Sequence, residues 1–187
     1  TRDFVKIFMN IALYLDAEQC VRELSTIIKF FNQQRNSVSY FRFPFASDMS
    51  MEVMRAVVEK ELTGVTFSAR AREVECAWQE TDTQVINGVK EVALKHGVRV
   101  RSKYACYLTT LGPYGYFKTP NKIFINIVDA DISHVMETIV HEVLHLALYE
   151  KAHHLKLTHE QCENLIDSQF KSGILKELFP MYRCATD

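Results

Sequence analysis

A short apolar run with two histidines constrains the fold of this chain more than any other feature. Residues 138–150 read TIVHEVLHLALYE, where His141 and His145 are four positions apart and Glu142 follows the first histidine. On a helix, positions i and i+4 share one face, so both imidazoles can point at a single ion. The uncharged neighbours predict a buried helix, in which the lone carboxylate of Glu142 would be costly without a compensating cation. The pattern favours a zinc site over the alternative, a core helix with two hydrogen-bonded histidines.

This pattern also predicts a reaction. Zinc in a hydrolytic site has three protein ligands and a fourth position open to water, whose pKa it lowers to about 7. A carboxylate beside the ligands can accept the proton of that water. We therefore expect one zinc ion per chain and a zinc-dependent hydrolase acting on a peptide or protein substrate, with Glu142 as general base.

The third zinc ligand is sought after this helix. A metzincin would have glycine and histidine where this chain has Leu148 and Lys151, so that type of site is excluded. Glu163 is the leading candidate, because it lies on a predicted helix that follows a short loop. Asp167, one turn further on, can accept the second N–H of a ligand imidazole and fix its tautomer. His159, which opens the same helix, is the alternative ligand.

HEVLH followed by ENLID on the next helix resembles the gluzincin branch of the zincin metallopeptidases, over about residues 122–170. The resemblance implies that a peptide lies extended along the strand KIFINIV, as along the edge of a zincin sheet. It also implies a role for each matching residue, namely zinc ligands at His141, His145 and Glu163, a general base at Glu142, and a hydrogen-bond partner of a ligand at Asp167.

The chain departs from the gluzincin pattern in two places. Seventeen residues separate His145 from Glu163, fewer than in the commonest gluzincins, and Cys162 stands where the family has asparagine. With His159 as third ligand the site would resemble the SprT-like proteases, and with Asp167 the aspzincins. The residue that stabilises the oxyanion is left open among Tyr114, Tyr116, Tyr149, Tyr182 and Arg183.

Charge and cysteine content narrow the possible partners and compartment. The chain has 22 basic and 23 acidic residues, so no strong field favours nucleic acid or an anionic membrane. Its five cysteines form no C-x-x-C pair, which favours reduced thiols and a cytoplasmic location. No signal peptide is visible, and the apolar stretch near the start is too short to span a bilayer, so we expect a soluble protein. The chain begins at Thr1 without methionine, which is compatible with removal of an upstream segment.

We expect one helix-rich α+β zincin-like domain over residues 1–187. A helical part would occupy about 1–97, and a small, mostly antiparallel sheet and the metal-site helices about 98–187. The expected elements are helices over 3–31, 48–62, 69–96, 133–150 and 158–171, an extended segment at 38–45 and two or three strands within 98–128.

Two alternatives are open. The first apolar run can instead form a strand, followed by a helix that Asp16 caps with Gln19 as its reciprocal partner. In function, the rival to a peptidase is a catalytically inactive zinc-binding scaffold or interaction module. The intact Glu142 opposes that rival, because structural zinc needs no base.

Overall fold

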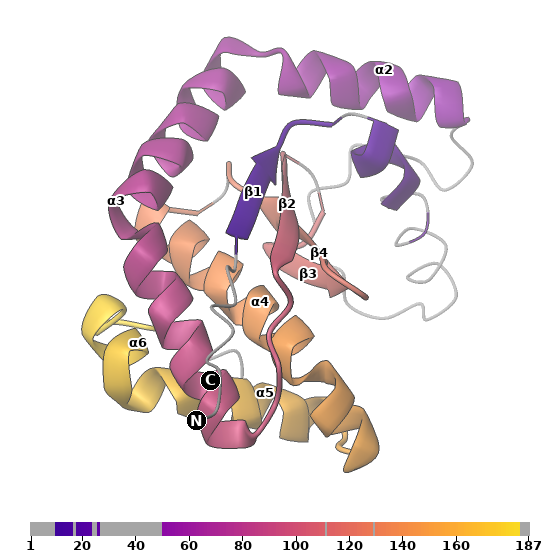
Figure 1. Ribbon diagram of the computed structural model, residues 1–187. Helices are drawn as coiled ribbons and strands as arrows, with labels where there is room; N and C mark the ends of the chain where they lie inside the picture. The colour runs from indigo at the N-terminus through magenta and orange to yellow at the C-terminus, as the bar shows by residue number, and fades with distance from the viewer. Residues whose placement is uncertain are drawn as a thin grey trace.

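The computed structural model describes residues 10–16, 18–23, 26, 50–110, 112–128 and 130–183 (Figure 1). The predicted α+β class is confirmed, with long helices beside a small sheet. In chain order the elements are β1 (Asn10–Tyr14), α2 (Met51–Leu62), α3 (Val65–His96), β2 (Lys103–Thr109), β3 (Gly115–Lys118), β4 (Lys122–Asn126), α4 (Ile132–His154), α5 (His159–Asp167), the 3₁₀ turn η1 (Ser168–Lys171) and α6 (Gly173–Leu178).

The four-stranded sheet has the order β1-β2-β4-β3 and is mixed. The prediction of a mostly antiparallel sheet is wrong, because β1 pairs with β2 and β2 with β4 in parallel. Only the short hairpin of β3 and β4 is antiparallel. The segment KIFINIV, expected at the edge, contains the interior strand β4, and β3 occupies the edge instead.

The start of the described chain follows the alternative prediction. Asn10–Tyr14 form a strand that pairs with β2, and residues 18–23 are helical. The Gln19 backbone N–H donates to a carboxylate oxygen of Asp16 at 2.9 Å, as expected for a helix N-cap. The favoured helix over 3–31 is therefore wrong at 10–14, because pairing with a strand 93 residues further along the chain overrides the local pattern. The expected segment at 38–45 lies outside the described residues.

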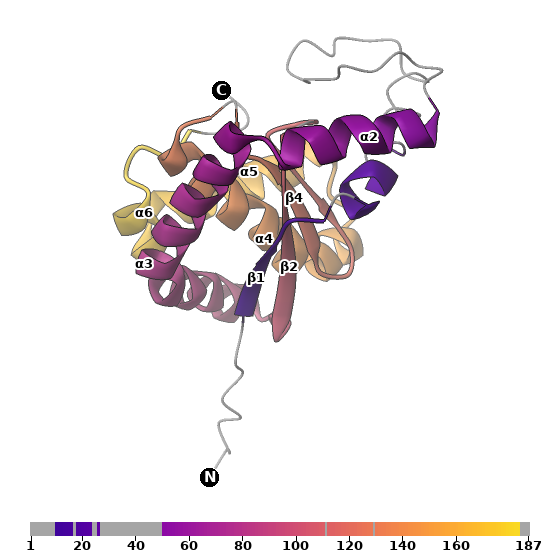
Figure 2. The ribbon, with the colours of Figure 1, turned by 90° about the horizontal axis from the view of Figure 1, so that it is seen from above.

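The two helices that lie between β1 and β2 in the chain, α2 and α3, are separated only by Thr63 and Gly64. α2 begins after Ser50, whose side chain accepts from the backbone N–H of Val53, two residues later than expected from Asp48. α3 is one continuous helix of 32 residues. It ends at Gly97, whose left-handed conformation (φ 66°) is common for glycine after the end of a helix. Figure 2 shows α2 crossing one end of the sheet and α3 running beside it.

α4 is the central helix of the structure. Every residue from Val135 to Leu148 except Thr138 is buried, and the helix contacts α3, α5, β3 and β4. Arg70 of α3 stabilises the segment between β4 and α4, because its guanidinium donates to the carbonyl oxygens of Ile127 and Ala130. α4 thus begins from a fixed position, with Asp131 as N-cap.

The sheet has two different faces. Tyr104, Cys106 and Leu108 of β2 belong to the core cluster that includes α3 and α4. Alternate residues form an aromatic ladder on the other face, with ring centroids 4.7–5.3 Å apart, through Tyr14, Tyr107, Phe124 and Tyr116. The helical residues 18–23 cover part of this face, where Lys118 pairs with Glu23 at 2.6 Å.

Within the part of the chain that the structure describes, no helix combines the length and the hydropathy needed to cross a bilayer.

Candidate metal centre

The two histidines of the HEVLH motif lie on the buried part of α4, where their side chains turn toward α5. His141 and His145 are 9% and 8% exposed, and the Glu163 side chain is 14% exposed. α5 begins at a capping box, in which Thr158 and Gln161 each accept a backbone N–H from the other. Two separate local signals, the motif and the cap, thus bring these three residues together.

The donor atoms of these residues converge on one point. Nε2 of His141 and Nε2 of His145 are 2.9 Å apart. The Glu163 carboxylate lies 3.1 Å from the first of these nitrogens and 3.2 Å from the second. Tetrahedral zinc with ligands at about 2.0–2.1 Å separates them by roughly 3.3 Å, so the trio fits zinc with a small outward shift. No other trio of His, Cys, Asp or Glu donors converges in this way among the described residues.

A hydrogen-bond chain fixes the tautomer of His141. Nδ1 of His141 lies 2.7 Å from the Tyr182 hydroxyl, which donates to Oδ1 of Asp167 at 2.7 Å. Because the hydroxyl gives its proton to Asp167, its oxygen accepts from Nδ1–H of His141. In the neutral ring Nε2 then carries a lone pair, as a metal ligand requires. Asp167 thus acts on the histidine through Tyr182 and not by the direct contact expected from the sequence.

The Tyr182 ring is itself held in place. It stacks on Phe170 with a centroid distance of 3.7 Å and an interplanar angle of 1°. Arg183, the next residue, forms an exposed ion pair at 3.7 Å with Asp131, the N-cap of α4. Tyr182, considered from the sequence as an oxyanion donor, is therefore already engaged in positioning His141.

The pKa values of His141 and Glu163 depend on each other. Burial raises the pKa of Glu163, but hydrogen bonds from His141 and His145 outweigh it and hold the pKa well below its usual range. Burial lowers the pKa of His141, yet the hydrogen bond with Glu163 and the charge of Glu142 leave it raised. Two facing imidazole nitrogens and a carboxylate therefore need a positive species between them, either a proton or a metal ion.

Glu142 lies beside this trio, between α4 and β3. It is 7% exposed, and burial raises its pKa although His141 and His145 act in the opposite direction. A raised carboxyl pKa suits a residue that must take up and release a proton near neutral pH. Gly115 of β3 makes room for it, because a Cβ there would lie 2.9 Å from Oε1 of Glu142.

The edge strand β3 runs beside the candidate centre. Phe117 stacks on the His145 ring, with centroids 5.0 Å apart and planes at 14°. Its ring also lies edge-on to that of Tyr149, with centroids 6.1 Å apart. Gly115 lies next to Glu142, so successive inward positions of β3 contact successive turns of α4. The second edge of β3 pairs with no other strand among the described residues.

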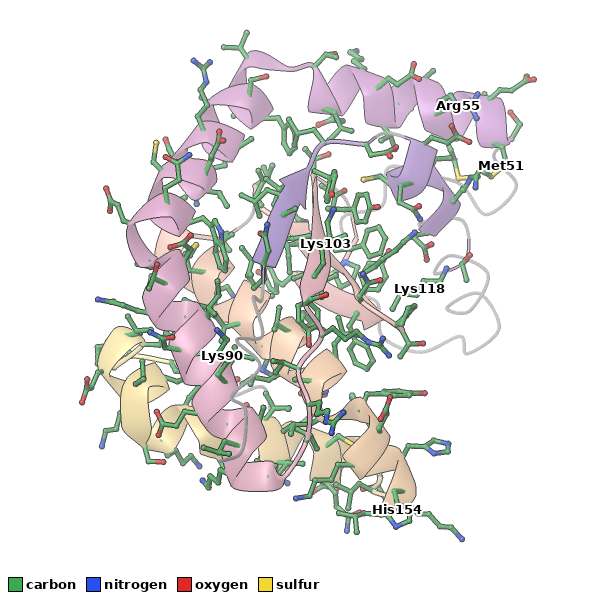
Figure 3. The ribbon with its side chains drawn as sticks, viewed as in Figure 1. Met51, Arg55, Lys90, Lys103, Lys118 and His154 are labelled. Carbon is green, nitrogen blue, oxygen red and sulfur yellow. The ribbon has the colours of Figure 1, made fainter. Side chains whose placement is uncertain are left out.

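The other histidines on these helices, and Tyr116, lie outside the converging trio. His159 is 3.5 Å from Glu163 but its side chain is 89% exposed, and it is outside the converging group. The His134 ring packs edge-on against Tyr114. His154 lies exposed at the end of α4 (Figure 3). Tyr116 belongs to the aromatic ladder on the other face of the sheet, where burial raises its pKa, so it is no oxyanion donor for this site.

Sequence reasoning did not single out two residues of the site, Gly115 and Phe117. Gly115 sits in GPYGY, which reads as turn residues, and Phe117 stands two positions later. Their roles depend on packing against α4, for which no local signal exists. The link between Tyr182 and Asp167 is also a tertiary contact over 15 residues.

Comparison with known proteins gives no match. No protein-family model matches the chain, and no curated protein or solved structure is significantly similar to it.

Proposed function

We propose that this protein is a zinc-dependent peptidase that resembles the gluzincins in its ligand set. The observation that carries the proposal is the convergence of His141, His145 and Glu163 within 4.8 Å, with Glu142 buried beside them. Structural zinc needs no adjacent base, whereas a hydrolase does. The companion proposal is one zinc ion per chain.

A zinc ion held by these three residues would polarise a substrate carbonyl and lower the pKa of water at its open position. Glu142 accepts the proton of the attacking water and then donates it to the leaving amine. The Tyr182–Asp167 chain holds His141 in the tautomer that can bind the metal.

The edge strand supplies a place for an extended substrate. A peptide that lies along β3 would pair with its free backbone groups, as in other strand-addition complexes. Gly115 and Phe117 would then place the peptide beside Glu142 and His145. This geometry supports a peptide over a small isolated ligand as substrate.

We also propose that the protein works in a reducing compartment, because the cysteines that the structure describes are free thiols. Cys20, Cys76, Cys106 and Cys162 are all unpaired in the structure. Two of them, Cys20 and Cys106, are buried, and burial raises the pKa of Cys20 to about 12 and that of Cys106 further, so both are poor nucleophiles.

The proposal is tested with Glu142→Gln. The amide preserves shape but cannot accept a proton, so the variant should bind one zinc ion per chain and lose at least about a hundredfold in turnover of a peptide library, within the range of general-base contributions. If the wild-type chain and the variant both bind zinc and neither cleaves any peptide, the protein is a zinc-bearing scaffold instead.

A further inference from the structure

Hydrolysis at this site needs a donor for the negative charge that develops on the substrate's carbonyl oxygen. The carboxylates of Glu142 and Glu163 already lie at this place, so charge that grows on a further oxygen is unfavourable without a hydrogen-bond donor. Removal of one such donor lowers turnover about 10²–10³-fold in other hydrolases. The sequence leaves four tyrosines and Arg183 open for this role.

Three of these five candidates are engaged elsewhere. Tyr116 belongs to the aromatic ladder on the other face of the sheet. The Tyr182 hydroxyl is already bonded to His141 and to a carboxylate. Arg183 pairs with Asp131, which lies about 15 Å before His141 along the axis of α4 by helical rise.

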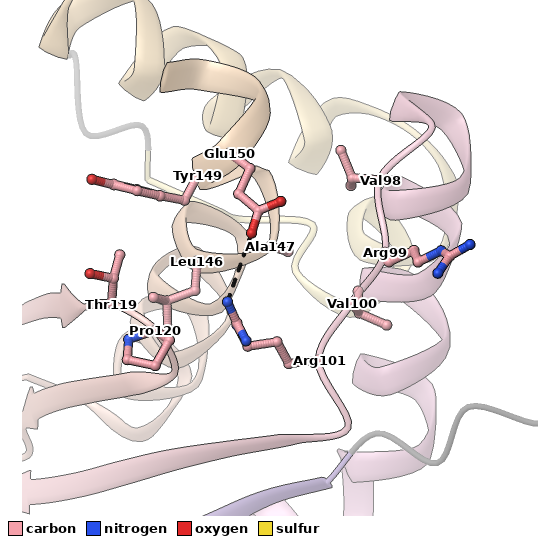
Figure 4. A pocket seen from close by; sticks show the side chains of 10 residues that line it. All are labelled: Val98, Arg99, Val100, Arg101, Thr119, Pro120, Leu146, Ala147, Tyr149 and Glu150. Atoms are coloured by element: carbon pink, nitrogen blue, oxygen red, sulfur yellow. Dashed lines mark ion pairs between the residues drawn. The ribbon is translucent and has the colours of Figure 1, made fainter. Parts of the chain in front are cut away.

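The two remaining tyrosines flank the trio along the axis of α4. Tyr114 packs edge-on against His134, which lies about 10 Å before His141 by helical rise. Tyr149 follows His145 by one turn. Figure 4 shows Tyr149 among the residues that line a pocket of about 530 Å³, and no member of the trio lines that pocket.

His159 differs from these candidates because it contacts the trio directly. Its Nδ1 lies 3.5 Å from Oε1 of Glu163, and the same oxygen lies 3.2 Å from Nε2 of His145. The His159 side chain is 89% exposed, whereas those of the trio are 8–14% exposed. The ring therefore lies where the buried trio meets solvent, and a substrate that reaches the trio from this side meets His159.

The His159 ring is anchored at its backbone and available at its nitrogens. The capping box at Thr158 fixes the start of α5, where His159 is the first residue. The 3.5 Å contact with Glu163 is longer than a normal N–H···O hydrogen bond, so it holds the ring only loosely. A neutral imidazole carries one N–H donor. A side-chain rotation can bring that donor to an oxygen held beside Glu163.

We propose that His159 is a catalytic residue that donates a hydrogen bond to the substrate's carbonyl oxygen as negative charge develops there. The inference rests on the proposed peptidase function and gives His159 a role other than that of a metal ligand. His159 keeps its proton throughout, so the proton taken from water and given to the leaving amine is still carried by Glu142 alone.

The kinetics of His159→Leu test this assignment. On the library peptide that the zinc-loaded wild type cleaves fastest, kcat should fall at least about tenfold, with KM and zinc affinity changed less than about threefold. His159→Gln retains an N–H donor, so its kcat should exceed that of His159→Leu at least about threefold. His154→Leu changes another exposed histidine, at the end of α4, and should match the wild type. A smaller loss in His159→Leu, or equal losses in the leucine and glutamine variants, overturns the assignment.

A second measurement does not depend on turnover. A phosphinic peptide has a negatively charged oxygen on a tetrahedral phosphorus and so imitates the charge that develops in the reaction. In calorimetric titrations of the zinc-loaded chain, His159→Leu should weaken its binding by about the same factor as kcat/KM. The uncleaved substrate peptide should bind the Glu142→Gln chain equally well with and without His159→Leu. Unchanged binding of the phosphinic peptide overturns the assignment.

The outcomes separate the two proposals. If the wild type cleaves peptides and His159→Leu leaves both kcat and phosphinic-peptide affinity unchanged, the donor assignment is wrong and the peptidase stands. If His159→Leu lowers zinc affinity more than about a hundredfold, beyond the effect of outer partners, His159 is a zinc ligand and the donor assignment is again wrong. If the wild type binds zinc but cleaves no peptide, both proposals are wrong.

Discussion

The Tyr182 hydroxyl lies 2.7 Å from Nδ1 of His141 and donates to Asp167 at the same distance. One tyrosine thus connects an imidazole on α4 with a buried carboxylate on α5. These hydrogen bonds fix the orientation of the His141 ring, so that its Nε2 faces His145 and Glu163. This link makes the end of the described chain part of the candidate zinc site.

Tyr182→Phe removes the hydroxyl but keeps the ring that stacks on Phe170. Zinc affinity should fall about 10–100-fold, the usual effect of losing an outer hydrogen-bond partner of a ligand. Competition with a chromogenic chelator measures it. Tyr14→Phe, on the other face of the sheet, is the matched control. An unchanged affinity in Tyr182→Phe would show that the link does not support the metal.

Asp167→Asn tests whether the aspartate acts through the same tyrosine. Its effect on zinc affinity and that of Tyr182→Phe should not add in the double variant, because both changes break one hydrogen-bond chain. Calorimetric titration of the four proteins with zinc gives the coupling. Fully additive losses would mean that Asp167 acts on the site independently of Tyr182.

The third ligand can be assigned by comparing Glu163 with His159. Glu163→Gln should lower zinc affinity by more than about a hundredfold, a larger loss than outer partners cause, because its carboxylate lies 3.1–3.2 Å from both imidazole nitrogens. His159→Ala should change the affinity less than about threefold, since that side chain is 89% exposed. The reverse order of effects would assign the ligand to His159.

Much of the site can be predicted from local sequence patterns, and the remainder depends on tertiary contacts between distant segments. His141 and His145 share a face because helical spacing demands it, and the capping box at Thr158 sets the start of α5. The strand at Asn10–Tyr14, in contrast, depends on β2, which lies far away in sequence. The edge position of β3 likewise depends on how strands are ordered, which no local pattern encodes.

Gly115→Ala should separate catalysis from metal binding. The added Cβ would lie 2.4 Å from Cγ2 of Thr138 and 2.9 Å from Oε1 of Glu142, so one of them must move. We expect zinc content to be unchanged and kcat to fall about tenfold or more, as misplaced catalytic groups do. Steady-state kinetics and metal content measure both.

The variant Gly115→Ala/Thr138→Ser provides the control for Gly115→Ala. It removes the 2.4 Å contact but keeps the one with Glu142, so stability should recover further than kcat. Equal recovery of both would place the effect of Gly115→Ala in general packing and not at Glu142.

Zinc affinity should fall steeply on acidification. The pKa of His141 is raised in the metal-free chain, because the hydrogen bond with Glu163 and the charge of Glu142 outweigh the effect of burial. Zinc needs the neutral ring, so below that pKa each pH unit should cost about tenfold in affinity from this group alone. Glu163 adds no competition near neutral pH, because its pKa is well below the usual range. An affinity that stays constant between about pH 7 and 5 would contradict this coupling.

X-ray absorption at the zinc edge, on the full chain purified with one equivalent of zinc, tests the central claim most directly. The spectrum should show two imidazole nitrogens at about 2.0–2.1 Å and oxygen ligands at about 2.0–2.2 Å, with the histidine signal lost in His141→Ala and His145→Ala. A folded chain that binds no zinc at ample concentration, or a spectrum with no histidine signal, would contradict the account.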